Sequence, residues 1–241
     1  MDRILGTNEL ALKYTPNRVQ QLEGEGRRPA RTRATIMPRS YRDNVFINCP
    51  FDSDYKPVFD SLVFVIQDAG FIARCALEIS DGTQNRLQKI LAIVAECRYG
   101  IHDLSRTELD PTNSLPRFNM PFELGLFMGC KWFGNKMQRA KSCLILDRDL
   151  YRYQKFISDI SGQDIYCHND QPEQALGMVR NWLRTESKRS DMPGKAAIWR
   201  RYYQFRLDLP SLCHKFKIEA DELTFADYTQ IVAEWLRQSA Q

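Results

Sequence analysis

From residue 44 onward, short apolar runs alternate along the chain with segments in which apolar residues recur every three or four positions. The runs have the length and the β-branched and aromatic content of buried strands, and the periodic segments are typical of helices. The predicted strands are NVFIN at 44–48, FIARCAL at 71–77, YGIHDLS at 99–105, SCLILD at 142–147 and QDIYCH at 163–168. The predicted helices span residues 55–69, 86–97, 119–134, 149–161 and 172–186. This alternation predicts an α/β protein with a doubly wound parallel sheet of about five strands.

The two ends of the chain lack this alternation. Residues 1–42 include a stretch rich in Arg, Gly and Pro, which predicts a mobile basic arm because so little apolar surface cannot offset the entropy of ordering. Residues 191–241 carry three helix-like segments and no convincing strand, which predicts a helical appendage. The α/β domain is therefore expected to span residues 43–190.

The predicted appendage is rich in aromatic side chains, and two hypotheses account for them. They are Trp199, Tyr202, Tyr203, Phe205 and Trp235. The favoured hypothesis is that they pack the appendage onto the main domain, since most such residues belong to a core. The other is that they transmit a signal from a ligand bound to the α/β domain.

The composition narrows the class of protein. Hydrophobic residues make up 43% and charged residues 27% of the 241 residues, which is typical of a globular protein. The chain has no apolar run of about 18 residues and no secretory signal layout, so we expect a cytoplasmic protein without membrane contacts. The seven cysteines form no CxxC pair, which predicts reduced thiols and neither a disulfide framework nor a zinc site.

Polar residues gather where the predicted strands end. In a doubly wound sheet the ligand crevice lies beyond the carboxyl ends of the strands, so these residues are candidates for binding. They are Asn48, Cys49, Pro50, Phe51 and Asp52 after the first strand, His102, Asp103, Leu104 and Ser105 at the end of the third, and Asn119 and Glu123 in the following helix. The absence of GxGxxG after the first strand, and of GxxxxGK[ST], GxSxG and HExxH, argues against a Rossmann dehydrogenase, a P-loop enzyme, a serine hydrolase and a zincin.

Glu123 is the most informative of these residues. On a helix it lies near Asn119, Leu126 and Phe127, so its carboxylate is expected on a largely apolar face close to the helix N-terminus. Burial there raises the pKa of a carboxyl group, while the helix dipole opposes that shift. The alternative is a glutamate that only compensates the helix dipole from the first turn.

Other polar residues have weaker indications. Asp103, at a strand end, could accept hydrogen bonds from ribose hydroxyls, and a loop-capping aspartate is the equally weighted alternative. His102 points to the opposite face of its strand and is expected to be a packed or capping histidine. His168 and His214 have no partner at a recognisable spacing and receive no role. The GxxxG spacing at 125–129 predicts close packing of its helix against the sheet or a ligand.

Three segments, FINCPFDSDY, AECRYGIHDLS and FNMPFELGLFMG, resemble the superfamily that groups nucleoside 2-deoxyribosyltransferases with Toll/interleukin-1-receptor (TIR) domains. The resemblance covers about residues 44–180, and its firmest point is the motif around Glu123, because members place a catalytic glutamate on the helix after the third strand. It implies a flavodoxin-like or TIR-like sheet with Glu123 as the catalytic carboxylate. It also implies that Asp103 contacts ribose or base and that Phe51 and Asn119 line the pocket. Similar bacterial TIR-like proteins cleave NAD or sense nucleotide signals in antiviral defence.

The leading hypothesis is therefore a nucleotide N-glycosidase, with NAD as the favoured substrate and no cofactor or metal. Glu123 and Asp103 are the predicted catalytic residues, since a carboxylate beside the sugar can stabilise the oxocarbenium character that develops when the glycosidic bond breaks. The predicted substrate-binding residues are Asn48, Pro50, Phe51, Asp52, Ser105 and Asn119. The alternatives are a nucleoside 2-deoxyribosyltransferase-like enzyme and a nucleotide-sensing module that does not react.

Partners other than a nucleotide are weakly indicated. A homo-oligomer or a partner in a defence system is what the resemblance implies. Nucleic acid is a third hypothesis, based on Arg27, Arg28, Arg31 and Arg33 of the arm together with Arg200 and Arg201. It is not favoured, because the net charge of +4 is modest and charge runs are usually only solvated.

Overall fold

The computed structural model describes residues 39–109 and 116–239, which lie within one compact unit. Most of the predicted basic arm, residues 1–38, lies outside the described residues. Residues 39–42 of the predicted arm belong to helix α1 (Arg39–Asp43). The hydroxyl of the buried Tyr41 in this helix donates a hydrogen bond to the Met137 carbonyl at 2.8 Å. The folded body therefore begins a few residues before the first strand.

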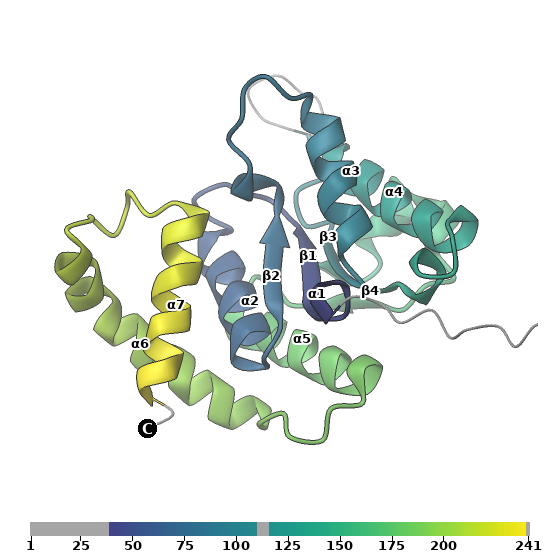
Figure 1. The fold of residues 1–241 in the computed structure, drawn as a ribbon. Coiled ribbons are helices and arrows are strands. Elements are labelled where there is room, and N and C mark those ends of the chain that lie inside the picture. The colour runs from purple at the N-terminus through teal and green to yellow at the C-terminus, as the bar shows by residue number, and fades with distance from the viewer. Residues whose placement is uncertain (1–38, 110–115, 240–241) are drawn as a thin grey trace, which may run out of the picture. The chain divides into compact units, whose positions relative to one another are not determined.

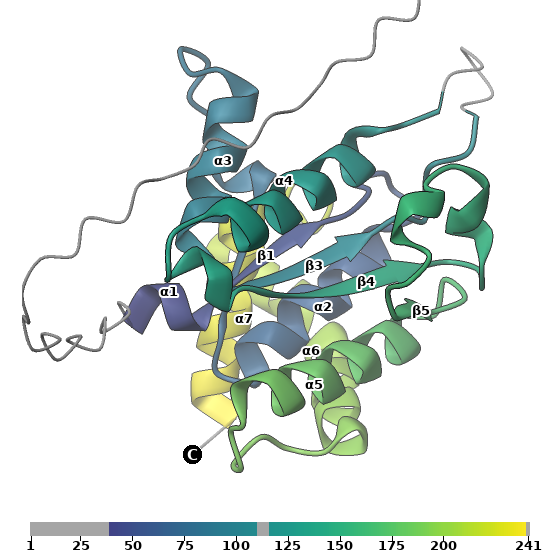
Figure 2. The ribbon, with the colours of Figure 1, turned by 90° about the vertical axis from the view of Figure 1, so that its right-hand side faces the viewer.

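The sheet has five strands that all run parallel, in the order β2-β1-β3-β4-β5. Figure 1 labels β1 to β4, and Figure 2 labels β5 beside β4. They are β1 (Asn44–Asn48), β2 (Ile72–Cys75), β3 (Tyr99–Asp103), β4 (Ser142–Asp147) and β5 (Ile165–Cys167). This confirms the predicted α/β class and the doubly wound parallel sheet. The strand order reverses between β1 and β3, and the carboxyl ends of these two strands mark the topological switch point where such folds bind ligands.

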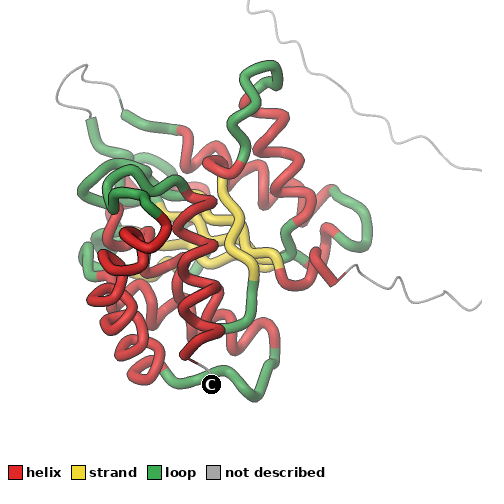
Figure 3. The backbone as a smooth tube through the Cα atoms, turned by 60° about the vertical axis from the view of Figure 1, so that its left-hand side comes forward, coloured by secondary structure: helices red, strands yellow, loops and turns green. Residues whose placement is uncertain are grey.

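Helices cover both faces of the sheet (Figures 2 and 3). The helices α2 (Lys56–Asp68) and α5 (Pro172–Ser187) lie on one face, and α3 (Arg86–Glu96) and α4 (Asn119–Phe133) lie on the other. Local sequence sets their ends. The Asn85 side chain accepts a hydrogen bond from the Leu87 amide at 2.9 Å and caps α3, and Gly70, with a φ of 75°, ends the turn after α2.

The C-terminal region forms two helices, α6 (Lys195–Phe216) and α7 (Phe225–Ser239), in place of the three predicted segments. Both pack on α2, whose residues 58–66 are all buried. The ring centroid of Phe64 lies 5.2 Å from that of Tyr202, 5.3 Å from Phe205 and 5.9 Å from Trp235. The packing hypothesis is thus confirmed for these three aromatic residues, whereas Tyr203 is 61% exposed.

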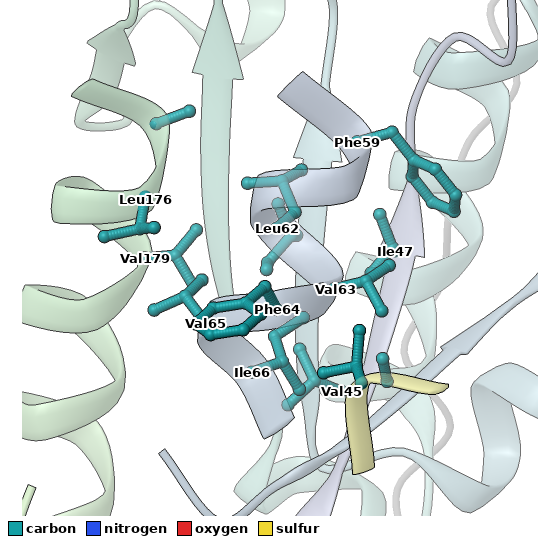
Figure 4. Packing of buried hydrophobic residues seen from close by; sticks show 14 of the residues in the cluster. Val45, Ile47, Phe59, Leu62, Val63, Phe64, Val65, Ile66, Leu176 and Val179 are labelled. Carbon is teal, nitrogen blue, oxygen red and sulfur yellow. The ribbon is translucent and has the colours of Figure 1, made fainter. Parts of the chain in front are cut away.

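The core shows why α2 needs a second covering layer. In Figure 4, Val63 of α2 lies near Ile47 of β1, while Leu176 and Val179 of α5 lie on the other side of the same helix. Apolar residues surround the whole circumference of α2, so one sheet face cannot bury them all. The helices α6 and α7 complete that burial.

The prediction of an amphipathic helix at 149–161 is wrong. This segment contains two short 3₁₀ turns, Arg152–Lys155 and Ser158–Ile160. Tyr151 adopts a left-handed conformation with φ of 59° and Ile157 is not helical, which stops a continuous helix. The Arg152 guanidinium instead donates hydrogen bonds to the Asp147 carboxylate, at 2.6 and 3.0 Å, and to the Leu104 carbonyl. Tertiary contacts have overridden the local periodicity.

Two further findings concern the cysteines and the length of the apolar helices. All seven cysteines are free, as predicted from their spacing, and four of them are buried. Among the helices of residues 39–109 and 116–239, none is long and apolar enough to cross a membrane.

Replacing Ile231 with valine is expected to lower the free energy of unfolding by about 1 kcal/mol, because it removes one methylene from a buried side chain. Since Ile231 of α7 shares one core with β1 and α2, urea unfolding should remain a single transition by tryptophan fluorescence and by circular dichroism. Leu207→Ala, at a position 58% exposed on α6, is the control and should change stability by less than about 0.5 kcal/mol. A separate early transition of the C-terminal helices would contradict a shared core.

Candidate functional site

Three acidic side chains approach the end of β1 from different elements. Cys49 follows β1 directly and is buried. Burial raises the pKa of its thiol, and the neighbouring carboxylates of Asp103, Glu123 and Asp52 raise it further. Asp103 ends β3, Glu123 lies on α4, and Asp52 belongs to the loop after β1. The switch point is therefore surrounded by carboxylates.

Asn48, the last residue of β1, fixes α4 over the sheet. Its amide nitrogen donates to the Met120 carbonyl at 2.9 Å and to His102 Nδ1 at 3.0 Å. His102 is buried against Phe127, at a ring-centroid distance of 5.0 Å, and burial together with Lys141 lowers its pKa to about 3. The ring is therefore neutral, and the prediction of a packed histidine on the opposite face is confirmed.

Glu123 lies on the sheet-facing side of α4, between Met120 and Phe127 along the helix, and is 7% exposed. Burial raises the pKa of its carboxyl group to about 7, with Arg86 opposing the shift. Among the residues that the structure describes, none forms a hydrogen bond or ion pair with this carboxylate. The first turn of α4 contains no acidic residue, so Glu123 is not a dipole-compensating first-turn glutamate.

Asp103 is fully buried in a hydrogen-bond network on the other face of the sheet. Its Oδ2 accepts from the Tyr55 hydroxyl at 2.6 Å and from His168 Nε2 at 2.8 Å, and its Oδ1 accepts from the Ser105 amide at 2.8 Å. Burial acts to raise the pKa of Asp103, but the hydrogen bonds from His168, Ser105 and Tyr55 outweigh it and hold that pKa below its ordinary value. The Asp170 amide donates to His168 Nδ1 at 3.0 Å, so the ring proton lies on Nε2 and points to Asp103.

The structure brings only some of the predicted substrate-binding residues together. Ser105 is buried, and its hydroxyl lies 3.1 Å from His168 Nε2 within the Asp103 network. Pro50 is buried after β1, and Asn119 is exposed at the start of α4. The predicted contact between Asp103 and a ribose stays a prediction, but none of the surface of Asp103 is exposed.

Phe51 and Asp52 line a pocket of about 230 Å³ that also involves α7 and the loop before it. The Phe51 ring, 39% exposed, meets the Phe59 ring edge-on at 5.4 Å. Lys56 forms a 3.0 Å ion pair with the buried Asp60 and lies 5.4 Å from the ring centroid of Tyr228. The remaining lining residues are Ser53, Leu77, Asp221, Leu223, Thr224 and Phe225. The pocket therefore joins the loop after β1 to α7.

An arginine surrounded by three carboxylates stands at the rim of the switch point. Arg106 follows β3, and its side chain is 25% exposed. Its carboxylate neighbours are Asp52 at 3.6 Å, Asp54 at 3.8 Å and Glu108 at 3.9 Å. No described residue accepts a hydrogen bond from its guanidinium. A guanidinium can donate two parallel hydrogen bonds to a phosphate, which here would have to displace these carboxylates.

Sequence spacing missed His168, Tyr55 and Arg106. Two of them occupy positions that could have drawn attention, since His168 directly follows β5 and Arg106 lies three residues after β3. Tyr55 precedes α2, and nothing in the sequence relates it to Asp103. Within the described ranges, no group of His, Cys, Asp or Glu residues is arranged to hold a metal ion.

The carboxyl edge of the sheet thus combines a buried carboxylate, an internal polar network and a rim arginine. Together these groups suit a phosphorylated sugar: the arginine for its phosphate and the carboxylate for charge on the sugar ring. In comparisons with known proteins, no family model, no curated protein and no solved structure matches the chain.

Proposed function

We propose that the chain is a nucleotide N-glycosidase, with NAD as its favoured substrate and Glu123 as its catalytic carboxylate. One observation carries this proposal: Glu123 is 7% exposed, has a pKa near 7 and has no hydrogen-bond or ion-pair partner among the described residues, beside the β1–β3 switch point. An ionised carboxylate that is buried without a partner lowers the stability of the folded protein. Perturbed carboxyl groups of this kind are typical of catalytic sites.

The reaction needs few protein groups. The bond between the nicotinamide nitrogen and the anomeric carbon breaks, and its electron pair leaves with nicotinamide, which is thereby neutralised. The ionised Glu123 stabilises the positive charge that develops on the ribose, or forms a transient ester with it. Water then adds to the anomeric carbon and releases a proton, giving ADP-ribose. Because the leaving group is already cationic in NAD, no general acid is required.

Other residues would support this step. Asn48 holds the first turn of α4, and so the position of Glu123, through its bond to the Met120 carbonyl. Arg106 would bind a phosphate of the dinucleotide, and Phe51 would contact a base or ribose from the rim. Asp103 would act as a positioning residue, because its oxygens bind Tyr55, His168 and Ser105.

The family resemblance supports the same function. The sequence around Glu123, FNMPFELGLFMG, resembles the helix that carries the catalytic glutamate in the nucleoside 2-deoxyribosyltransferase and TIR superfamily, and α4 does follow the third strand. On this basis we propose that the protein is a cytoplasmic nucleotide hydrolase similar to bacterial TIR-like proteins, with a role in antiviral defence. The seven free thiols are in keeping with a reducing compartment.

The experiment is to incubate the purified full chain with NAD and to follow nicotinamide release, over a range of protein concentrations that allows assembly. The proposal predicts release of nicotinamide and ADP-ribose. If neither NAD nor any nucleoside is consumed at any protein concentration, the enzymatic function is wrong.

The pH profile of NAD cleavage is expected to rise with pH through about 7 and then to stay level. Glu123 must be ionised to stabilise the developing charge, and its pKa is raised to about 7, so the active fraction grows across that range. The measurement is kcat/KM for NAD between pH 5 and 9. A bell-shaped profile would instead indicate that a proton donor is needed, as for the neutral base of an ordinary nucleoside. That result would favour the deoxyribosyltransferase-like alternative.

A nucleotide-sensing module is the second candidate function, and the pocket of about 230 Å³ favours it. A ligand there would contact Phe51 of the main domain and Tyr228 of α7 at the same time. Calorimetric titration with NAD and ADP-ribose discriminates the two functions. Binding without nicotinamide release, lost in Leu77→Trp at the pocket wall but kept in the exposed control Leu150→Trp, would support the sensor.

A further inference from the structure

The helix α4 is apolar on both of its sides. Its sheet-facing side buries Met120, Leu124, Phe127 and Met128. The opposite side, which we call the outer α4 face, consists of Phe118, Phe122, Gly125, Gly129, Trp132 and Phe133. Its four aromatic side chains are 55%, 55%, 57% and 86% exposed, in chain order.

The two glycines lie on this outer face and not against the sheet. A Cβ atom added to Gly125 or to Gly129 would meet no atom within 4 Å outside the helix itself. The prediction that the GxxxG spacing packs the helix closely on the sheet is therefore wrong. The glycines instead form a shallow gap between Phe122 and Trp132.

A comparison with α2 shows how unusual this exposure is. Both helices are apolar around their circumference, and such helices are normally buried on all sides. The outer side of α2 is covered by α6 and α7, which place Tyr202 and Trp235 against Phe64. No helix or strand of the described residues covers the outer α4 face in this way.

The exposed area of the outer α4 face is comparable to that of a protein–protein interface. With roughly 200 Å² for each aromatic side chain, the exposed fractions correspond to roughly 500 Å² of aromatic surface. The largest exposed apolar patch of a typical monomer is roughly 300–600 Å² and is often functional, and a standard interface buries about 800 Å² on each partner. The helix supplies the greater part of such an interface.

We propose that the outer α4 face binds the same face of a second copy of this chain. The two α4 helices would run antiparallel, related by a twofold axis that crosses the outer face midway between Gly125 and Gly129. The order of the residues along the outer α4 face favours a second copy as the partner. A twofold axis there places Gly125 opposite the partner's Gly129 and Phe122 opposite the partner's Trp132, so aromatic surface meets aromatic surface at both ends. The face carries no charged residue, so two copies meet without repulsion between like charges.

This interface does not depend on the proposed catalytic function. Glu123 lies on the buried side of α4, away from the outer face, so dimerisation does not cover its carboxylate. The dimer would stand even if NAD were not a substrate.

Sedimentation equilibrium of the full chain from about 1 to 100 µM tests the proposal. The wild-type protein is expected to have twice its chain mass of 28.2 kDa. Phe122→Asp, which places a charge in the interface, is expected to raise the dimer dissociation constant at least about 30-fold. Leu207→Asp makes the same kind of change at a residue 58% exposed on α6 and should leave the dimer intact.

Gly125→Leu is the second variant, because it separates dimerisation from folding. The added side chain finds open space in the monomer and leucine favours helix, so the melting temperature of the monomer should not fall. The same side chain fills the gap that the partner helix needs, so the dimer should dissociate. A monomeric wild-type protein at 100 µM, a dimer that persists in both α4 variants, equal dissociation by Leu207→Asp, or polydisperse wild-type aggregates would each overturn the proposal.

Discussion

Replacing Glu123 with glutamine is expected to slow nicotinamide release by about 10²–10⁴-fold and, at pH 8, to make the folded protein more stable. The first effect follows because glutamine cannot stabilise the positive charge on the ribose. The second follows because the ionised carboxylate is buried at 7% exposure without a described partner, whereas a neutral amide avoids that cost.

The pH dependence of the stability effect has a definite sign. The pKa of Glu123 rises from its ordinary 4.5 to about 7 in the folded protein. The folded state therefore binds its proton more tightly, and the native carboxyl loses stability as pH rises from about 4.5 to about 7. Above that range the loss is constant and amounts to at most about 3 kcal/mol. Glu123→Gln should thus be stabilising at pH 8 and near neutral at pH 4.

Urea unfolding at pH 4 and pH 8, combined with the NAD assay, measures both effects. Glu222→Gln, at an exposed position in the loop before α7, is the control and should change neither stability nor activity. A variant that keeps full activity would remove Glu123 from the catalytic step. A variant that is inactive but less stable at pH 8 would indicate a structural role instead.

Replacing Asp103 with alanine is expected to lower the free energy of unfolding by about 3–5 kcal/mol at pH 7. The change leaves the buried Tyr55 hydroxyl without its acceptor, removes the acceptor that lies 2.8 Å from His168 Nε2, and deprives the Ser105 amide of its partner. Asp103→Asn keeps the shape of the side chain and should cost less. Asp149→Ala, at a carboxylate 54% exposed, should cost less than about 1 kcal/mol.

The cost of Asp103→Ala should also depend on pH. The pKa of Asp103 is held below its ordinary 3.8, so its contribution to stability is present above that value and is lost as pH falls through the lowered pKa. Urea unfolding at pH 7 and at about pH 2.5 should therefore show a smaller difference between wild type and variant at the lower pH. A cost below about 1 kcal/mol at pH 7, or one that does not change with pH, would contradict an ionised, hydrogen-bonded Asp103.

Most of the fold follows from the sequence, because the hydrophobic periodicity of each segment agrees with the residues that begin and end it. The run at 142–147 is β4 without an error at either end, and Asn85 and Gly70 bound their helices as residues of their type commonly do. The segment 149–161 fails for the opposite reason. Its helical period competes with the hydrogen bonds of Arg152 to Asp147, which are tertiary and invisible to a local pattern.

The candidate site is only partly predictable for a related reason. The burial of Glu123 and the orientation of His102 follow from helix and strand geometry alone. The network of Asp103 does not, because Tyr55 and His168 lie 48 and 65 residues away in the chain. The outer α4 face was missed because a GxxxG spacing does not say which side of its helix is covered.

A structure of the Glu123→Gln variant with bound NAD tests the central claim most directly, since the substitution slows turnover enough to retain the substrate. The account predicts that the anomeric carbon of the nicotinamide ribose lies about 3–3.5 Å from the side-chain oxygen at position 123, a distance that allows reaction in the native enzyme. NAD bound only in the pocket between Phe51 and Tyr228, with position 123 still covered by apolar side chains, would contradict the claim.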